Sequence, residues 1–384
     1  MRAGGAAATP QAGETASIGF APVVRRALLV GLLLGPLVVV LHYVANLGDT
    51  LEFVLSALAL VPLAWLIGEA TEHAAERTGP GIGGFLNATF GNAPELIIAL
   101  IAINEGLTEV VRGSLTGSVV GNLLLVLGFS LLVGPRGQLD RWSSFVSFGA
   151  IGIAIALFLV PAVPSWSGNP DRQEIVDLSV PVSIALLVVY AIVTYFSLRR
   201  HRAMNRSQDD ADVRVDAWSL RSALGVLGVA TVVTALVAEI LVGSLEAFAE
   251  QVGLSDFFVS AVIVAIVGNA AEHGGAVVVA HRGKVDLAAE IALASAAQVA
   301  MFLIPAVTLL SWLIEPLALG FREVGIAALA GGLLVTAATL FRGTVSKGRG
   351  AVLVAAYVVV VVLFYVAGNR DGGTDAVALA GALA

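Results

Sequence analysis

The sequence predicts an all-α polytopic membrane protein with eleven transmembrane helices, in which one N-terminal helix precedes two five-helix repeats of inverted topology. Three observations predict this fold: long apolar runs fill the chain, the basic residues fall mostly on one side of these runs, and one short motif occurs twice. Of the 384 residues, 58% are hydrophobic and only 13% are charged, whereas about 25% charged is usual in soluble domains. The mean hydropathy of +0.93 agrees with a membrane protein.

The expected helices follow from apolar runs that are long enough to cross the hydrocarbon core of a bilayer. A crossing takes about 20 residues, and continuous runs of this length fit helices rather than the short alternating strands of a barrel. We expect spans at 24–46, 51–73, 82–104, 110–134, 143–164, 175–198, 217–245, 255–281, 286–314, 323–341 and 351–368. Residues 1–23 are expected to form a disordered tail without a cleavable signal peptide, and 369–384 a second tail.

The distribution of basic residues gives the expected orientation. If the N-terminus is cytoplasmic, 17 of the 21 Lys and Arg residues fall on the cytoplasmic side, and only Arg112, Arg172, Arg322 and Arg370 fall outside. This is the positive-inside pattern, and it places the C-terminus of the multi-pass protein outside. The short linker and the lack of a targeting extension favour the cell (inner) membrane as its location. The polar stretch 199–216 is expected to be a cytoplasmic linker.

A repeated motif divides the chain into two halves. The run Gly91–Glu95 (GNAPE) recurs 177 positions later as Gly268–Glu272 (GNAAE), and each run lies within an expected span. Residues 51–198 and 217–368 then hold five spans each. Because five is an odd number, the two halves enter the membrane from opposite sides, as in many secondary transporters whose substrate site lies at midplane between the halves.

Each run places a carboxylate at membrane depth, Glu95 in the first half and Glu272 in the second. An intramembrane acid is costly unless it is neutralised, so a functional role is the default interpretation; the alternative is a hydrogen-bonded acid that serves helix packing. Asn92 and Asn269 lie three positions before these glutamates, so each shares a helix face with its glutamate. They are candidate cation ligands, with interhelical packing as the alternative.

Helix breaks at the two runs would supply the ligands of a hard divalent cation. Pro94 removes a backbone donor and, together with Gly91, frees the Phe90 carbonyl. In the second run Ala271 replaces Pro94, so unwinding there depends on Gly268. Carboxylate, amide and carbonyl oxygens are the ligands of Ca²⁺, which takes about six to eight of them.

The fourth and ninth spans hold polar residues that complete the candidate cation site. Ser118 and Asn122 lie on one, and Ser295 and Gln298 on the other, each pair at helical spacing. The hydroxyls have an alternative role in bonding back to carbonyls of their own helices. The amides have an alternative role in joining helices.

Charge balance indicates the reaction. Two buried carboxylates without an ion carry two negative charges, and both burial and a like-charged neighbour favour their protonation. One Ca²⁺ or two protons neutralises the site, and only the neutral forms pass easily through an occluded state. We therefore expect a secondary active transporter that exchanges cytoplasmic Ca²⁺ for protons by alternating access. The expected partners are Ca²⁺, H⁺ and the lipid bilayer; no cofactor, enzymatic activity or nucleic-acid partner is expected, and the oligomeric state is left open.

Four further residues are candidates for the ion pathway. Glu239 is expected on the cytoplasmic side of the centre of the seventh span, from where it passes ions toward the site. Glu72 and Glu246 are expected at the cytoplasmic end of the second span and the outer end of the seventh, where they attract cations. His273 follows Glu272 and is a candidate proton relay, although adjacent helix positions do not face the same way. The alternative for each acid is a solvated or structurally satisfied side chain.

Several segments resemble the cation/proton exchanger (CAX) family of the calcium/cation antiporter superfamily. They are Leu66–Glu76 (LIGEATEHAAE), Gly84–Leu100 (GFLNATFGNAPELIIAL), Gly121–Gly128 (GNLLLVLG), Val267–His273 (VGNAAEH) and Leu293–Pro305 (LASAAQVAMFLIP). The resemblance implies an eleven-helix fold, Ca²⁺/H⁺ antiport, and a metal site at Glu95 and Glu272. Pro94 departs from the small or hydroxyl residue that is usual in this family and is similar to the sodium-coupled branch. The lack of acids beside Asn122 and Gln298, where sodium-coupled members carry them, favours protons.

Three other functions are weighed against this expectation. A Na⁺/Ca²⁺ exchanger of the same superfamily differs only in the coupling ion. An intramembrane metallohydrolase would need a ligand cluster such as H-E-x-x-H, and none of the five histidines stands in that arrangement. A passive channel fits broken helices in inverted halves less well than alternating access does.

Overall fold

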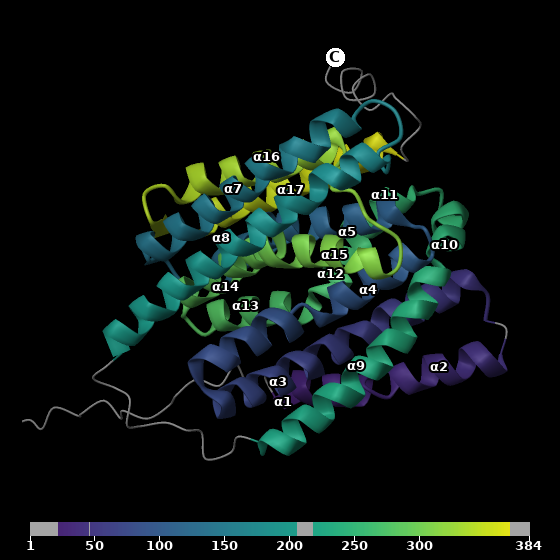
Figure 1. Cartoon of the computed structure of the whole chain (residues 1–384). Helices are drawn as coiled ribbons and strands as arrows, with labels where there is room; N and C mark the ends of the chain where they lie inside the picture. Colours follow the sequence, from purple (N-terminus) through teal and green to yellow (C-terminus); the bar gives the residue numbers. More distant parts are fainter. Residues whose placement is uncertain (1–21, 46, 206–217, 369–384) are drawn as a thin grey trace, which may run out of the picture.

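A computed structural model describes residues 22–45, 47–205 and 218–368, and these residues form a helical bundle in which long helices run side by side (Figure 1). The α-helices are α1 (Pro22–Gly31), α2 (Leu34–Val44), α3 (Asp49–Phe90), α4 (Ala93–Asn104), α5 (Thr108–Val120), α6 (Leu127–Val133), α7 (Arg141–Ser165), α8 (Gln173–Asn205), α9 (Leu220–Gly243), α10 (Leu245–Val252), α11 (Asp256–Phe258), α12 (Ala265–Gly268), α13 (Ala270–His281), α14 (Val285–Gln298), α15 (Ile304–Leu310), α16 (Glu323–Leu340) and α17 (Lys347–Ala367).

Short irregular elements connect some of these helices. Three π-helical segments join α5 to α6, α11 to α12 and α14 to α15; they are η1 (Gly121–Val126), η2 (Val259–Val264) and η3 (Val299–Leu303). A 3₁₀ turn, η4 (Ser311–Leu313), follows α15. Two strands of two residues each, β1 (Gly137–Gln138) and β2 (Thr344–Val345), pair antiparallel and tie together the loops before α7 and before α17.

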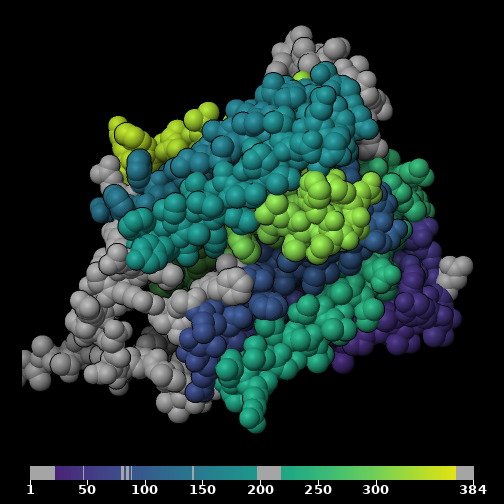
Figure 2. Space-filling model, in the orientation of Figure 1, coloured from purple at the N-terminus to yellow at the C-terminus, as the bar shows by residue number. Residues whose placement is uncertain are grey.

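The length and surface of the helices show a polytopic all-α membrane protein. Nine helices among the described residues are long and apolar enough to cross a membrane, and a bent pair, α10 with Asp256–Gly268, makes a tenth if it counts as one span. In the space-filling view, α8 and α9 run across the face as separate bands (Figure 2). Their exposed side chains include Ile184, Val188, Val229 and Val232, as expected for helices in contact with lipid tails rather than water.

The expected count of eleven spans is not confirmed, because two of the expected spans are divided. The expected span 82–104 falls partly on α3 and partly on α4. The expected span 255–281 is interrupted at Asn269, between α12 and α13. Helix α8 also continues to Asn205, so the first part of the expected linker 199–216 is helical. The rest of that linker, residues 1–21 and residues 369–384 lie outside the described part of the chain.

Helix α3 is continuous in its hydrogen bonding but does not run straight. A Cβ atom added to Gly83 would lie 2.7 Å from the carbonyl oxygen of Ala75, whereas eight residues of straight helix advance by about 12 Å. The chain therefore turns back after Thr78, where the membrane-crossing part of α3 ends. The run 79–81 (Gly-Pro-Gly) lies at this turn, and both residue types weaken a helix interior.

Arg112, one of the basic residues expected outside, is almost completely buried, with 1% of its surface exposed. Its guanidinium pairs with Glu109 at 2.7 Å and with Asp171, and its Nε donates to the carbonyl oxygen of Ala318 at 3.1 Å. A buried charge is tolerated only when it is paired and hydrogen-bonded. Arg112 thus fixes α5 to two loops that are distant in the sequence.

Arg322 is buried to the same degree at the end of α17. It donates hydrogen bonds to the carbonyl oxygens of Gly368 at 2.7 Å and Ala367 at 3.0 Å. The guanidinium also lies 4.5 Å from the ring centroid of Phe257. A cation at this position satisfies the last carbonyls of α17 and complements the negative end of the helix.

The two halves of the sequence approach closely where α5 packs against η2. Gly113 and Gly117 face η2, and a Cβ atom on Gly113 would lie 3.1 Å from the carbonyl oxygen of Phe257. A Cβ atom on Gly117 would overlap the carbonyl oxygen of Ala261 and lie 2.7 Å from the Cβ of Ala265. Glycine at these positions therefore allows backbone contact between the halves, as small residues do at many membrane-helix interfaces.

We expect Gly117→Ala to destabilise the fold by about 1–3 kcal/mol or more, because the added methyl group must push α5 away from η2. The measurement is the thermal unfolding midpoint of the purified protein in detergent. Gly225→Ala on α9 is the matched control, because a Cβ atom there meets nothing within 4 Å and alanine is the better helix former. Equal midpoints for the two variants would contradict the close approach.

Candidate cation-binding site

The two repeated runs break their helices at the same place. Helix α3 ends at Phe90 and α4 begins at Ala93, with Asn92 at φ −104° and ψ 21° between them. Helix α12 ends at Gly268 and α13 begins at Ala270, with Asn269 at φ −92° and ψ 9°. The expectation of a broken helix is therefore confirmed at both runs. The second run has Ala271 at the position of Pro94, so a proline is not needed to form a break of this kind.

The breaks place both glutamates at the beginning of a helix. Glu95 lies in the first turn of α4 and Glu272 in the first turn of α13. The N-terminus of a helix carries a partial positive charge from its unsatisfied N–H groups. Each carboxylate thus lies at a helix N-terminus, where the partial positive charge of the backbone stabilises a negative charge.

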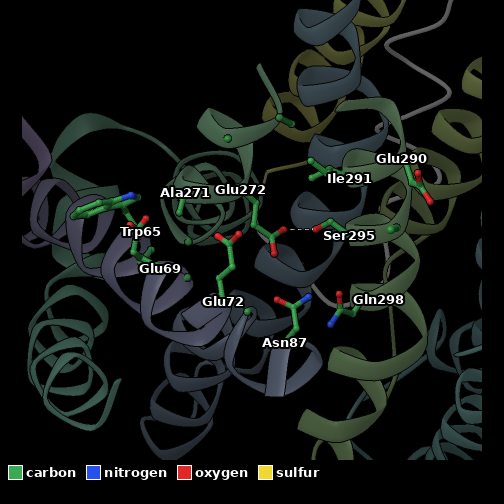
Figure 3. A pocket seen from close by; sticks show the side chains of 17 residues that line it. Trp65, Glu69, Glu72, Asn87, Ala271, Glu272, Glu290, Ile291, Ser295 and Gln298 are labelled. Atoms are coloured by element: carbon green, nitrogen blue, oxygen red, sulfur yellow. Dashed lines mark hydrogen bonds between the residues drawn. The ribbon is translucent and has the colours of Figure 1, made fainter. Parts of the chain in front are cut away.

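A cavity of about 380 Å³ lies between α3, α13 and α14 (Figure 3). Glu72 of α3 and Glu272 of α13 point toward each other across it, and Ser295 of α14 lies beside Glu272. Its polar lining consists of Trp65, Glu69, Glu72, Asn87, Glu272, Glu290, Ser295 and Gln298, and most of the rest is alanine and glycine. The small residues leave the space open for an ion with part of its hydration shell.

Glu95 lies directly behind the wall of this cavity. Gly268 lines the cavity, and a Cβ atom on Gly268 would lie 3.2 Å from the Cγ of Glu95. Glu95 is 8% exposed, and Glu272 lines the same cavity as Gly268. The two glutamates from opposite halves of the sequence therefore lie at one site. Glu272 accepts a hydrogen bond from the Ser295 hydroxyl.

Polar contacts between the halves orient an amide oxygen beside the glutamates. The Nδ2 of Asn269 donates to the hydroxyl of Ser118 at 2.8 Å and to the carbonyl oxygen of Ala265 at 2.9 Å. The Nδ2 of Asn122 donates to the carbonyl oxygen of Ser118 at 3.0 Å. Both donors of Asn269 are thus used, and its Oδ1 is buried with no hydrogen-bond partner among the described residues. An amide held in this way presents its oxygen to a cation.

The structure describes the contacts of the four polar residues on the fourth and ninth expected spans. Asn122 bonds to its own helix, and Ser118 accepts from Asn269 of the other half. Ser295 bonds to Glu272, and Gln298 lines the cavity. Asn122 lies within the π-helical segment η1, and Gln298 immediately precedes η3. Such segments occur mainly as short insertions in α-helices, often at functional sites.

Among the twelve candidate residues, four line the cavity: Glu72, Glu272, Ser295 and Gln298. Asn92, Glu95, Ser118, Asn122 and Asn269 are buried next to it rather than in its lining. Glu246 is exposed on α10, away from this cavity. The Nε2 of His273 is buried without a hydrogen-bond partner in the described structure, and its Cε1 lies 4.0 Å from a Cβ atom placed on Gly121.

The expected position of Glu239 is wrong. Helix α9 begins at Leu220, after the linker, and Glu239 lies four residues before its end at Gly243. The residue is therefore at the end of α9 remote from the linker, not on the linker side of the centre. Its side chain is exposed, on the same face as Val232 and Leu236, and it does not line the cavity.

Four polar residues of the cavity lining were missed by the sequence analysis: Trp65, Glu69, Asn87 and Glu290. Glu69 lies one turn before Glu72 on the same helix, so its spacing could have indicated it. Asn87 falls after the turn in α3, which the sequence did not place. Glu290 accepts a hydrogen bond from the Ser143 hydroxyl at 3.1 Å and turns away from Glu272 (Figure 3).

The ligand atoms of the site suit a hard cation that is transported rather than bound permanently. Within the described residues, no three His, Cys, Asp or Glu side chains are grouped closely enough to hold a metal ion. The site instead offers two carboxylates together with amide and hydroxyl oxygens, the ligand types that Ca²⁺ takes in flexible geometry. The Oε2 of Glu95 is buried without a hydrogen-bond partner in that part of the chain, which an ion or a proton would satisfy.

Two broken helices that bring intramembrane carboxylates to one cavity define a membrane transporter of ions. The model of the sodium/calcium exchanger protein family matches residues 49–199 and 222–366. The chain therefore belongs to this family, and within it to the cation/proton exchanger (CAX) family that the motifs resemble.

Curated relatives cover most of the chain. It is 34% identical over 361 residues to a Ca²⁺/H⁺ antiporter of Aphanothece halophytica. The matched region covers 89% of this chain and 97% of the relative. It is 39% identical over 323 residues to the Ca²⁺/H⁺ antiporter ChaA of Bacillus subtilis (strain 168), which covers 82% of this chain and 91% of the relative. Relatives such as these are named as transporters rather than enzymes.

Solved structures have the same fold. The structure of native YfkE matches with a TM-score of 0.76 and 34% identity, covering 88% of this chain and 99% of that chain. An H⁺/Ca²⁺ exchanger CAX matches with a TM-score of 0.67 over 94% of this chain and 93% of that chain. At 16% identity this second likeness concerns the fold alone.

We expect Ser118→Ala to lower the stability of the protein by about 1–3 kcal/mol, because it removes an acceptor from the buried amide of Asn269. The thermal unfolding midpoint in metal-free detergent solution measures this change. Ser130→Ala is the matched control, since Ser130 is also buried but its hydroxyl has no hydrogen-bond partner among the described residues. A loss at Ser130 as large as that at Ser118 would contradict the cross-half contact.

Proposed function

We propose that this protein exchanges Ca²⁺ for protons across a membrane, with Glu95 and Glu272 binding the two ions in turn. One observation carries the proposal: the side chain of Glu95 lies against Gly268, which lines the same cavity as Glu272. The relatives named Ca²⁺/H⁺ antiporters support the choice of ions. Asn92, Asn269, Ser118 and the other polar residues of the site act as ligands or hold the ligands in place.

The electrostatics of the pair gives the coupling. Two carboxylates in a low-dielectric site repel each other and lose hydration, so the doubly charged form is strongly disfavoured. One Ca²⁺ or two protons removes the net charge. Since only neutral forms can be occluded at low cost, the protein returns with protons after it has released Ca²⁺, and the two fluxes are coupled.

The proposed architecture has eleven crossings in two inverted halves after an N-terminal helix. Helices α4 and α13 have twelve residues each and begin at equivalent positions. In each half the next span changes from α-helix to π-helix, at η1 and at η3. The family model matches two segments of similar length. These parallels support the repeat, and counting α4 and α13 with the residues before them supplies the missing crossings.

The proposed orientation places the cavity on the cytoplasmic side. Glu69 and Glu72 lie in the last turns of the membrane-crossing part of α3, close to Arg77, which contacts Trp218 at the end of the linker. The basic residues of this end, such as Arg282 and Lys284, are exposed, whereas Arg112 and Arg322 are buried. This pattern supports a cytoplasmic N-terminus, an outside C-terminus and an inward-facing state that alternates with an outward-facing one.

We expect Glu95→Gln and Glu272→Gln each to abolish exchange, because an amide can neither carry a proton nor balance the charge of Ca²⁺. The measurement is ⁴⁵Ca²⁺ uptake into inverted membrane vesicles with an imposed pH gradient. Glu174→Gln is the matched control, since that side chain is 85% exposed. Substantial antiport in either site variant would falsify the proposed coupling.

The coupling ion is tested in the same vesicles. For a proton-coupled exchanger we expect uptake in sodium-free buffer and collapse of uptake when a protonophore removes the pH gradient. Pro94 and the sodium/calcium name of the family model favour testing Na⁺ as the second candidate. Uptake that requires an outward-directed Na⁺ gradient and survives the protonophore would identify a Na⁺/Ca²⁺ exchanger instead.

A further inference from the structure

His73 lies beside Glu69, one of the residues that line the cavity. It lies in α3 before the turn at Thr78 and is 9% exposed. Its Nε2 is 3.9 Å from Glu69 Oε1, and its Nδ1 is 3.9 Å from Glu76 Oε2. The ring stacks on Trp218, with 4.7 Å between the centroids and 24° between the planes. Its Nδ1 is buried with no hydrogen-bond partner within the described residues.

These surroundings distinguish the two protonation states of the ring. Neutral imidazole has one N–H group and can donate to one carboxylate only. Imidazolium has two N–H groups, and each would face a carboxylate, Glu69 on one side and Glu76 on the other. It would also present a cation to the face of the Trp218 indole. Protonation therefore changes the contacts of His73 with all three neighbours.

The charged groups around His73 come from several elements. Helix α3 itself contributes Glu69, Glu72, Glu76 and Arg77. Arg25 of α1 lies 3.9 Å from Glu69, and Glu272 of α13 lines the same cavity as Glu69. From the segment before α9, Trp218 is held by a hydrogen bond of 3.2 Å from Arg77 Nε to its carbonyl oxygen.

Two of these neighbours connect His73 to transport. Glu69 lines the cavity through which a cation reaches Glu272. Trp218 packs against the small apolar cluster that contains Ala70 of α3 and Ala93, the first residue of α4. A change at His73 is thus transmitted to the charge of the cavity and to the packing beside the break that carries Glu95.

We propose that His73 is a proton sensor on the cytoplasmic side, which, when protonated, draws Glu69 away from the cavity and fixes Trp218 to α3, so that the protein captures cations less readily. This inference rests on the proposed function and orientation. A negatively charged cavity concentrates cations and speeds their binding. Because exchange brings protons into the cytoplasm, the sensor slows export when the cytoplasm becomes acidic.

The first test reads the His73–Trp218 contact without transport. A protonated imidazole stacked on indole quenches indole fluorescence. In the purified full-length protein we expect emission to fall when the buffer is acidified. The decrease in emission that is lost in the Trp218→Phe variant is assigned to Trp218. We expect the His73→Gln variant to lose the same decrease. His281→Gln is the matched control, an exposed histidine at the end of α13, and retains it.

The second test reads the effect on cation capture. In inverted vesicles the Ca²⁺ concentration for half-maximal uptake is measured with the external buffer at about pH 7.5 and at about pH 6, a range that spans histidine titration. Competition by protons at Glu95 and Glu272 raises this value in every variant. We expect the rise to be about fivefold smaller in His73→Gln than in the wild type, an effect of the size that one charge exerts across a partly hydrated cavity. Glu69→Gln should show the same smaller rise but keep the fluorescence step.

The outcomes separate the sensor from the proposed function. A fluorescence step that persists in His73→Gln, or an equal rise of the half-maximal concentration in His73→Gln and wild type, overturns the sensor. Absence of any pH-driven Ca²⁺ uptake by the wild type overturns the proposed function, and the fluorescence titration then still decides whether His73 and Trp218 respond to protons. Unfolding midpoints of His73→Gln and His281→Gln equal to that of the wild type show that a lost response is not a loss of fold.

Discussion

The repulsion between two carboxylates in a medium of low dielectric constant governs this structure. Glu95 and Glu272 come from segments 177 positions apart, and each is costly to bury alone and more costly to bury beside the other. The described residues lessen this cost without a Lys or Arg side chain in the lining of the cavity. Each glutamate starts a helix, where the backbone N–H groups favour a negative charge, and Ser295 donates a hydrogen bond to Glu272. The remaining compensation is left to mobile ions.

Fixed positive charge is placed elsewhere in the molecule. Arg112 and Arg322 are buried, but their charges are used within the protein, by Glu109 and Asp171 in one case and by the end of α17 in the other. These contacts hold loops and helix ends together and are distinct from the polar contacts of the cavity. In the proposed exchange, a guanidinium within reach of the two glutamates would neutralise them permanently and abolish the competition between ions, so the proposal requires its separation from them.

The cavity holds further acidic side chains on one side of the two glutamates. Glu69 and Glu72 add negative charge in front of Glu272, whereas Glu95 stays behind Gly268. The two glutamates therefore differ in access although their sequence positions are equivalent. Under the proposed alternating access, such an asymmetry between related halves is expected of any single state. In the same proposal, protonation of His73 changes the negative charge of the cavity.

The sequence by itself determined the class of protein, the family and the main acids, because apolar length, charge distribution and a repeated GNA-x-E run are local properties. It also predicted the helix breaks at both runs. It did not determine that α3 turns back after Thr78, that Glu239 lies at the far end of α9, or that Glu69 and Asn87 face the cavity. These depend on how helices pack around one another, since helical spacing defines a face but not what that face meets. Only the tertiary structure decided that the Asn269 amide is held by Ser118 of the other half, because contacts between distant segments leave no periodic signal in the chain.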